Sequence, residues 1–451
     1  MNMKKTTMII LCLSGLLSCS KAILDAKPDS AQIVPGTVAD YQQLINNQNY
    51  FNYSAFLGEA GGDNYYVTEN VWANLNPVCK NSYIWAQDPF EGGTVNDWNG
   101  SFTTIYYSNT VLEGVSRLGA EKNTPAGLYT TGMAYFFRAH AFFQLAQLFC
   151  KAYDPATALT DLGIPLRLKS DVSLRVSRST VQETYDQIIA DLSKAEELLP
   201  ARSDYKTRPD KLATAALLSR VYLSMSVYEK AWQYANKALS QYNVLLDYNT
   251  LKNAAVPFVQ FNDEVILHVT MNGSNIFNAD NNCTVDTLLY GSFDENDLRK
   301  QLYFGTGTNS QHYFKGTYAG VTTSSKFCGL AVDELYLTRA ECYAQKEMLP
   351  EAMDDLNKLM IKRYNNSGFK PFQATTKADA LQKILTERRK ELLFRGLRWM
   401  DLRRLNLAGA NIKLKRIIKN DTFSLSANSE RYVYPIPDQE LIYNPMPQNE
   451  R

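Results

Sequence analysis

The sequence predicts a mainly α-helical protein in which tetratricopeptide-like helical hairpins support an irregular, loop-rich lobe with short strands. Three observations lead to this fold class. Apolar residues recur at three- and four-residue spacing over long segments from residue 98 onward. Two pairs of such segments combine alanine with aromatic residues, as tetratricopeptide helix pairs do. Two other stretches are rich in glycine, asparagine and aromatic residues and lack this periodicity.

The first residues have the pattern of a lipoprotein export signal. Lys4 and Lys5 precede an apolar run, Met8 to Leu17, which is too short for a membrane span of about 20 residues. A small residue, Ser18, then precedes Cys19. We therefore expect residues 1–18 to be removed and residues 19–36 to form a lipidated cysteine with an extended tether. An ordinary secretory signal with an incidental cysteine is the alternative.

The body is expected over residues 37–451, and its loop-rich ligand lobe over 37–97 and 245–330. Residues 50–97 mix five glycines with many aromatic rings, and residues 245–329 set short strand-like runs among polar stretches. Long aromatic-rich loops on a helical frame are typical of binding surfaces.

Sugars present apolar faces that stack on aromatic rings, and their hydroxyl groups need polar partners. The sequence therefore predicts ligand-binding residues in these loops. The first-rank candidates are Asp63, Asn64, Tyr66, Trp72, Asn81, Tyr83 and Trp85. The second-rank candidates are Asn275, Phe277, Asn281 and Tyr290.

The helical-repeat frame is expected over residues 98–244 and 331–405, followed by a C-terminal segment, 406–451. Single helices are predicted over 98–118 and 129–150 from their apolar spacing. Ser179, with Gln182 three residues later, predicts a capping box and a helix that ends before Pro200. Helical hairpins are predicted over 212–226 with 228–242, and over 332–346 with 351–364.

Composition argues against several classes of function. The 47 basic and 46 acidic side chains leave no excess positive charge to neutralise phosphates, so nucleic acid is not an expected partner. The three histidines are far apart, and the five cysteines after Cys19 include no CxxC, so no local zinc site is predicted. We expect buried thiols and no cofactor, and the sequence does not identify a metal.

The densest pattern is the run ERRKELLFRGLRWMDLRR at residues 387–404. Its three- and four-residue spacings predict ion pairs along one helical face, such as Glu391 with Arg395. A catalytic carboxylate pair, Glu387 and Glu391, is the alternative. The surrounding arginines would keep both groups ionised, which does not suit a general acid, so a structural role is favoured.

This run resembles the signature of the SusD/RagB family of outer-membrane nutrient-binding lipoproteins, in which glutamate is usual at the position of Arg395. Further pieces follow in the family's order over nearly the whole mature chain. They are RAHAFFQL at 138–145, GIPL at 163–166, AALLSRVYL at 215–223, ELYLTRAE at 334–341 and YPIP at 434–437.

The resemblance implies a SusD-like fold and a place on the outer face of the outer membrane. There the protein would capture oligosaccharide, or peptide in some members, for a partner TonB-dependent (SusC-like) transporter, without catalysis. Two other classes stay open: a helical-repeat interaction scaffold, and a glycosidase that uses Asp63 with Glu69 or Asp294 with Glu295.

Overall fold

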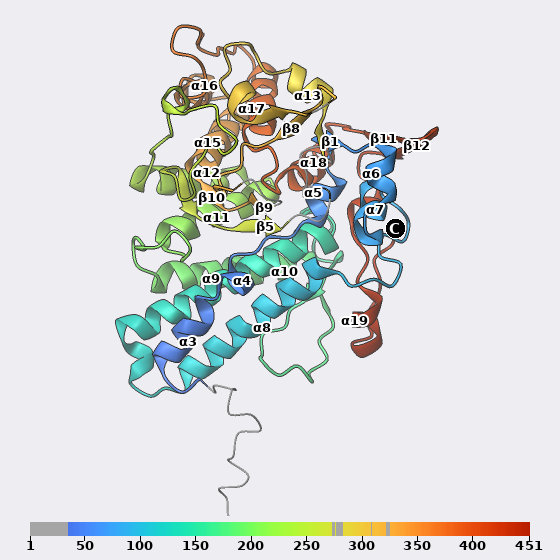
Figure 1. Ribbon diagram of the computed structural model, residues 1–451. Coiled ribbons are helices and arrows are strands. Elements are labelled where there is room, and N and C mark those ends of the chain that lie inside the picture. The colour runs from blue at the N-terminus through green and yellow to red at the C-terminus, as the bar shows by residue number, and fades with distance from the viewer. Residues whose placement is uncertain (1–34, 273–275, 277–282, 308, 322–324) are drawn as a thin grey trace, which may run out of the picture.

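The computed structural model describes residues 35–451, except 273–275, 277–282, 308 and 322–324. Cys19 and the second-rank candidates Asn275, Phe277 and Asn281 lie outside the described residues. The described chain is mainly helical with short strands, which confirms the predicted fold class. In Figure 1 the first long helices occupy the lower half, the later ones the upper half, and the short helices α5 to α7 lie to one side.

Seven long helices fall within about four residues of their predicted ends. They are α8 (Asn96–Ser116), α9 (Pro125–Phe149), α10 (Val181–Leu198), α11 (Lys211–Ser224), α12 (Tyr228–Gln241), α15 (Val332–Gln345) and α16 (Leu349–Met360). Two more, α17 (Lys377–Glu391) and α18 (Arg398–Leu407), had no predicted bounds. Both predicted hairpins are present, because α11 packs on α12 and α15 on α16.

The predicted capping box at Ser179 is wrong by one residue. Thr180 is the N-cap of α10: its side chain accepts from the Glu183 amide, and the Glu183 carboxylate accepts from the Thr180 amide. Ser179 lies instead in β3 (Arg178–Thr180), and its hydroxyl donates to the Ile164 carbonyl in β2 (Leu162–Pro165). The Ser179 hydroxyl is thus used across the β2–β3 pair, and Thr180, the last residue of β3, caps the helix.

Short helices, short turns and two-stranded antiparallel pairs make up the rest. The helices are α3 (Val38–Ile45), α4 (Gln48–Phe51), α5 (Leu57–Gly61), α6 (Glu69–Ala73), α7 (Pro77–Tyr83), α13 (Thr287–Gly291), α14 (Arg299–Leu302) and α19 (Asp438–Tyr443), with 3-10 turns η2 (Glu121–Asn123), η3 (Tyr248–Thr250) and η5 (Glu430–Tyr432). The strand pairs, besides β2 with β3, are β1 (Tyr65–Tyr66) with β6 (Thr284–Val285), β4 (Val265–Leu267) with β10 (Leu330–Ala331), β5 (Thr270–Asn272) with β9 (Ser325–Phe327), β7 (Phe304–Thr306) with β8 (His312–Phe314), and β11 (Leu414–Ile418) with β12 (Asp421–Leu425).

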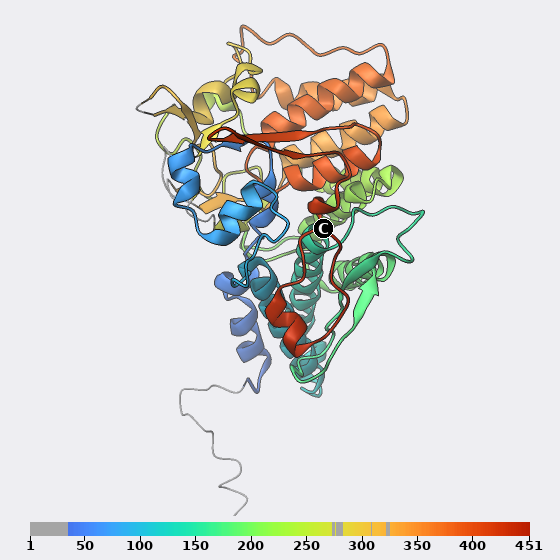
Figure 2. The same ribbon diagram turned by 90° about the vertical axis from the view of Figure 1, so that its right-hand side faces the viewer.

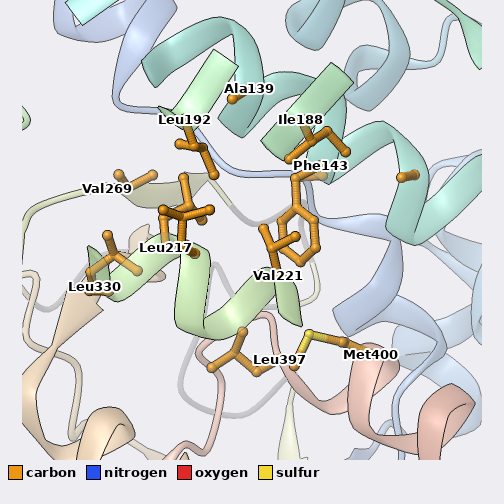
Figure 3. Packing of buried hydrophobic residues seen from close by; sticks show 14 of the residues in the cluster. Ala139, Phe143, Ile188, Leu192, Leu217, Val221, Val269, Leu330, Leu397 and Met400 are labelled. Carbon is orange, nitrogen blue, oxygen red and sulfur yellow. The ribbon is translucent and has the colours of Figure 1, made fainter. Parts of the chain in front are cut away.

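Two hydrophobic clusters form most of the core. The first lies between the long helices, where Phe143, Ile188 and Val221 meet Met400 (Figure 3). The second draws chiefly on residues 56–83 and 248–331 and is rich in tyrosine and phenylalanine. Figure 2 shows the blue segment, which includes residues 50–97, folded against the yellow segment near residue 290.

The charged run at 387–404 is not one helix. Helix α17 ends at Glu391, and the chain turns through Phe394 and Gly396, which have φ of 57° and 73°, before α18 begins. The predicted pairing of Glu391 with Arg395 is therefore wrong. Glu391 accepts from Arg299 and Arg363, and Arg395 donates to Asp333 at 2.6 Å.

The part of the chain that the structure describes contains neither a membrane span nor a disulfide. None of its helices is both long and apolar enough to cross a bilayer. Its five cysteines are buried, as expected, and burial raises the pKa of the Cys150 thiol to about 11.

Candidate functional site

The two loop-rich segments meet although they lie far apart in the sequence. In the β1–β6 pair Tyr66 faces Thr284, and the Asp286 amide donates to the Asn64 carbonyl at 2.9 Å. Tyr53 makes a second bridge, to Thr270. Residues 50–97 are therefore fixed against the second segment by backbone pairing.

Two of the predicted aromatic platforms are core residues. Tyr83 and Trp85 are each 1% exposed, and the Trp85 indole N–H donates to the Gly61 carbonyl at 3.0 Å. The guanidinium of Arg416 lies 4.2 Å from the Tyr83 ring centre. A ligand could stack on neither ring without a rearrangement of the core.

The three predicted polar partners are also engaged or buried. Asp63 accepts two hydrogen bonds from Arg398, at 2.6 and 2.9 Å. Burial alone would raise the pKa of Asp63, but Arg398 and Arg389 hold it well below its usual range. Asn64 accepts from Arg389 Nε at 3.2 Å, and Asn81 is buried.

Tyr66, Trp72 and Tyr290 are the predicted rings that reach the surface. Tyr66 is 39% exposed. Trp72 is half-buried: its indole N–H donates to the Lys80 carbonyl, and the Lys80 ammonium lies 4.5 Å from its ring centre. Tyr290 stacks on His312 with ring centres 3.6 Å apart. Each ring could offer a face to a ligand, and none of the three lines the pocket described next.

A pocket of about 480 Å³ opens beside α7 and the start of α8, and every residue that lines it comes from the predicted segment 50–97. Its volume is in the range of ligand pockets. The lining residues are Tyr53, Phe56, Leu57, Asn76, Pro77, Val78, Cys79, Phe90, Glu91, Gly93, Thr94, Val95, Asn96 and Asp97.

A tyrosine held by a buried carboxylate forms part of this pocket. The Tyr53 hydroxyl donates to Asp97 Oδ1 at 2.8 Å, and the amides of Phe56 and Leu57 donate to Oδ2 at 2.8 and 2.6 Å. Burial raises the pKa of Asp97, while these hydrogen bonds lower it in part. The half-buried Tyr53 ring is thus fixed in orientation before any ligand arrives.

Exposed polar side chains line the same pocket as that ring. Asn76, Glu91, Thr94 and Asn96 are exposed and line the pocket. Asn76 is also the N-cap of α7, where its side chain accepts from the Cys79 amide at 3.0 Å. An aromatic ring with hydroxyl, amide and carboxylate groups around it can bind a polyhydroxylated ligand.

The pocket thus lies in the predicted segment, but none of its lining residues is among the named candidates. Two of the candidates, Tyr83 and Trp85, have large rings, but both rings are buried in the core. One local signal was available: Asn76 before Pro77 is a helix start, and a helix start at a loop exposes its cap.

Three of the four carboxylates proposed for glycosidase chemistry are engaged in ion pairs. Asp63 is fixed in ion pairs, and Glu69 is exposed, 3.4 Å from the Lys419 ammonium. Asp294 is exposed and Glu295 pairs with Lys300. Retaining and inverting hydrolysis both require two carboxyl groups across one sugar, one of them with a raised pKa.

One set of buried carboxylates has oxygen atoms close enough to hold a cation. Glu264, Asp333 and Glu391 each offer an oxygen within 4.8 Å of the others. Arg363 donates to both glutamates and Arg395 to Asp333, so guanidinium groups already supply the positive charge.

Comparison with known families covers nearly the whole chain. A family model described as "Starch-binding associating with outer membrane" matches residues 23–223, and the SusD family model matches residues 219–451. "SusD-like protein P2" of Formosa agariphila is 23% identical over 413 residues, covering 78% of this chain and 79% of that protein.

Solved structures share the fold. A structure described as a putative sugar binding protein from Bacteroides vulgatus has a TM-score of 0.75 at 22% identity and covers 93% of this chain and 99% of its own. A SusD-like carbohydrate binding protein from the same species has a TM-score of 0.71 at 22% identity, covering 91% and 97%.

Proposed function

The chain belongs to the SusD family, and from this premise we propose that it is a surface lipoprotein that captures oligosaccharide, or peptide, and delivers it to a TonB-dependent (SusC-like) outer-membrane transporter. The family match and the sugar- and carbohydrate-binding names of structural neighbours favour a glycan ligand. The protein performs no covalent chemistry in this proposal.

The observation that carries the proposal is the pocket beside α7, with Tyr53 held by Asp97 at its wall. Sugar recognition needs a fixed aromatic face and several polar groups at its edge. The pocket provides both from one stretch of chain. The exposed ring of Tyr66 and the half-buried ring of Trp72 are proposed to extend the binding surface outside it.

The test is calorimetric titration of protein starting at Ala22 against a panel of oligosaccharides and short peptides. Tyr53→Ala should weaken binding about five- to thirtyfold, because a stacking aromatic contributes roughly 1–2 kcal/mol. Asn96→Ala should weaken ligand binding less than Tyr53→Ala does. Tyr53→Phe keeps the aromatic ring but removes its hydrogen bond to Asp97, so it measures the two contributions separately.

Tyr205→Ala is the matched control, since Tyr205 is 56% exposed and does not line the pocket. Each variant is first checked by thermal melting. If well-folded Tyr53→Ala, Tyr66→Ala and Trp72→Ala all bind a confirmed ligand as wild type does, the site lies elsewhere. If no member of the panel binds and the transporter is still bound, the scaffold alternative is favoured.

Lipid anchoring through Cys19 has its own test. Cys19→Ala should move the protein from the outer-membrane fraction to the soluble fraction, because no described helix could retain it there. An alanine variant that fractionates as firmly with the outer membrane as wild type would exclude this anchor.

A further inference from the structure

A second pocket, of about 400 Å³, lies between α13, α17 and α18, away from the one beside α7. It shares no lining residue with that pocket. Helices α13 and α17 lie side by side at the top of Figure 1. Three arginines line it, namely Arg388, Arg389 and Arg398.

These arginines have hydrogen-bonding capacity left over. Arg389 and Arg398 share one carboxylate, Asp63, which both contact through Nη2. Neither uses Nη1 in a hydrogen bond to any described residue. The side chains of Arg389 and Arg398 are 27% and 11% exposed, so solvent reaches both.

Arg388 supplies an independent observation. It is 1% exposed and donates through Nε to Asp401, which also accepts from Arg404. Its Nη2 is buried without a partner in the described part of the chain. An unpaired buried donor is unfavourable, and it belongs to a guanidinium group that lines this pocket.

The rest of the lining is partly apolar and partly polar. Its apolar residues are Leu288, Leu289, Leu385, Leu405, Ala410 and Ile412, and Leu288 is 83% exposed at the surface. Its polar residues are Ser292, Gln382, Thr386 and Asp401, and the Asp401 carboxylate accepts from Arg388 and Arg404. None of the described lining residues is aromatic, so the pocket lacks the stacking face that a sugar ring needs. Planar guanidinium groups match the geometry of a carboxylate.

We propose that this pocket binds the free carboxylate of an apolar peptide C-terminus. The carboxylate pairs with Arg389 and Arg398, and the last side chain packs against the leucines. Such a terminus could belong to a free peptide or to the tail of a partner protein. The proposal does not depend on the function proposed for the pocket beside α7.

The experiment uses calorimetry on the full mature chain with acetyl-Ala-Leu-Leu as the free acid and as the C-terminal amide. The acid should bind about tenfold or more tightly than the amide, because a charge-assisted pair is lost on amidation. Arg389→Gln should remove most of that difference. Arg117→Gln is the control, since its side chain is 77% exposed on α8.

Leu288→Asp keeps the test decisive if Arg389→Gln folds poorly. Leu288 is largely exposed, so the change should preserve the fold, while its new charge should weaken acid binding severalfold. Equal binding of acid and amide, no binding at millimolar concentration, unchanged binding by both variants, or equal binding of galacturonic acid would each overturn the proposal.

A ten-residue peptide with the same C-terminal residues distinguishes the two sources of such a terminus. Much tighter binding than that of the short peptide indicates the tail of a partner protein, and equal binding indicates a free peptide. Leu288→Asp should bind oligosaccharide as wild type does. Failure of the peptide proposal can therefore be distinguished from failure of the function proposed for the pocket beside α7.

Discussion

The helical frame and the loop-rich lobe are assembled in different ways. In the frame, helices that follow one another in sequence pack together, as α9 does with α10 and α11 with α12. In the lobe, the pairs join distant segments, for example Tyr66 with Thr284 and Tyr53 with Thr270. Local sequence patterns can encode the first kind of contact directly, whereas the second depends on the whole fold.

Two sets of buried charges also differ in size. Within the frame, Arg138 of α9 and Asp191 of α10 form a bidentate pair. At the junction of the lobe with α17, Glu391 accepts from both Arg299 and Arg363, and Arg363 also binds Glu264. Loss of Glu391 from this network should therefore affect more partners than loss of Asp191 from its pair.

Glu391→Ala tests this difference and has the largest expected effect. It leaves Arg299 and Arg363, each with a fully buried side chain, short of a partner, so the free energy of unfolding should fall by about 3–5 kcal/mol. Asp191→Ala is the comparison in the frame, where Arg138 keeps Asn109 as an acceptor and the loss should be smaller. Denaturant unfolding measures both. Equal losses would remove the distinction between network and pair.

Trp399→Ala tests the packing where the lobe meets the frame. Trp399 is 2% exposed, and a Cβ atom on Gly61 of α5 would lie 2.7 Å from its ring, so the glycine permits the close contact. The unfolding free energy should fall by at least about 3 kcal/mol. If Trp399→Ala melted like wild type but lost ligand binding, its role would be in recognition and not in packing.

The sequence predicted the frame well because its helices have their own periodicity and caps. It predicted the segment of the pocket from composition, but Tyr53 and Asn96 could not be chosen over Tyr83 and Trp85 from local pattern. Both of these buried rings contact Arg416, which lies more than three hundred residues away in the sequence. Likewise, the turn at Phe394 could not be inferred from helical spacing that continues across it.

The pH dependence of stability tests a buried carboxylate in the lobe, Glu59. Burial raises the pKa of Glu59 from 4.5 to about 7, although its carboxylate accepts from the Gly396 amide. Between these pH values Glu59 is ionised in the unfolded chain and protonated in the folded protein. The free energy of unfolding therefore falls as pH rises from about 4.5 to 7. Glu59→Gln lacks this titrating group. Its free energy of unfolding, measured relative to that of wild type, should therefore rise by roughly 2–3 kcal/mol between pH 4 and pH 8.

The matched control for this titration is Glu69→Gln, because Glu69 is exposed on α6. This change removes an exposed carboxylate and leaves the buried one in place. The measurement is the unfolding free energy from denaturant titration at four or five pH values. A flat difference for Glu59→Gln would mean that Glu59 is ionised in the folded protein at neutral pH.

The smallest expected effect is in the frame, at the cap of α10. Thr180→Ala removes the hydroxyl that accepts from the Glu183 amide, and should lower the unfolding free energy by about 1 kcal/mol. Thr180→Ser keeps the hydroxyl and should cost less. The loss stays local because the cap and its partner are three residues apart, whereas Glu391 holds two arginines from other parts of the chain. A loss as large as that of Glu391→Ala would show that the β2–β3 pair beside this cap, and not the cap alone, depends on Thr180.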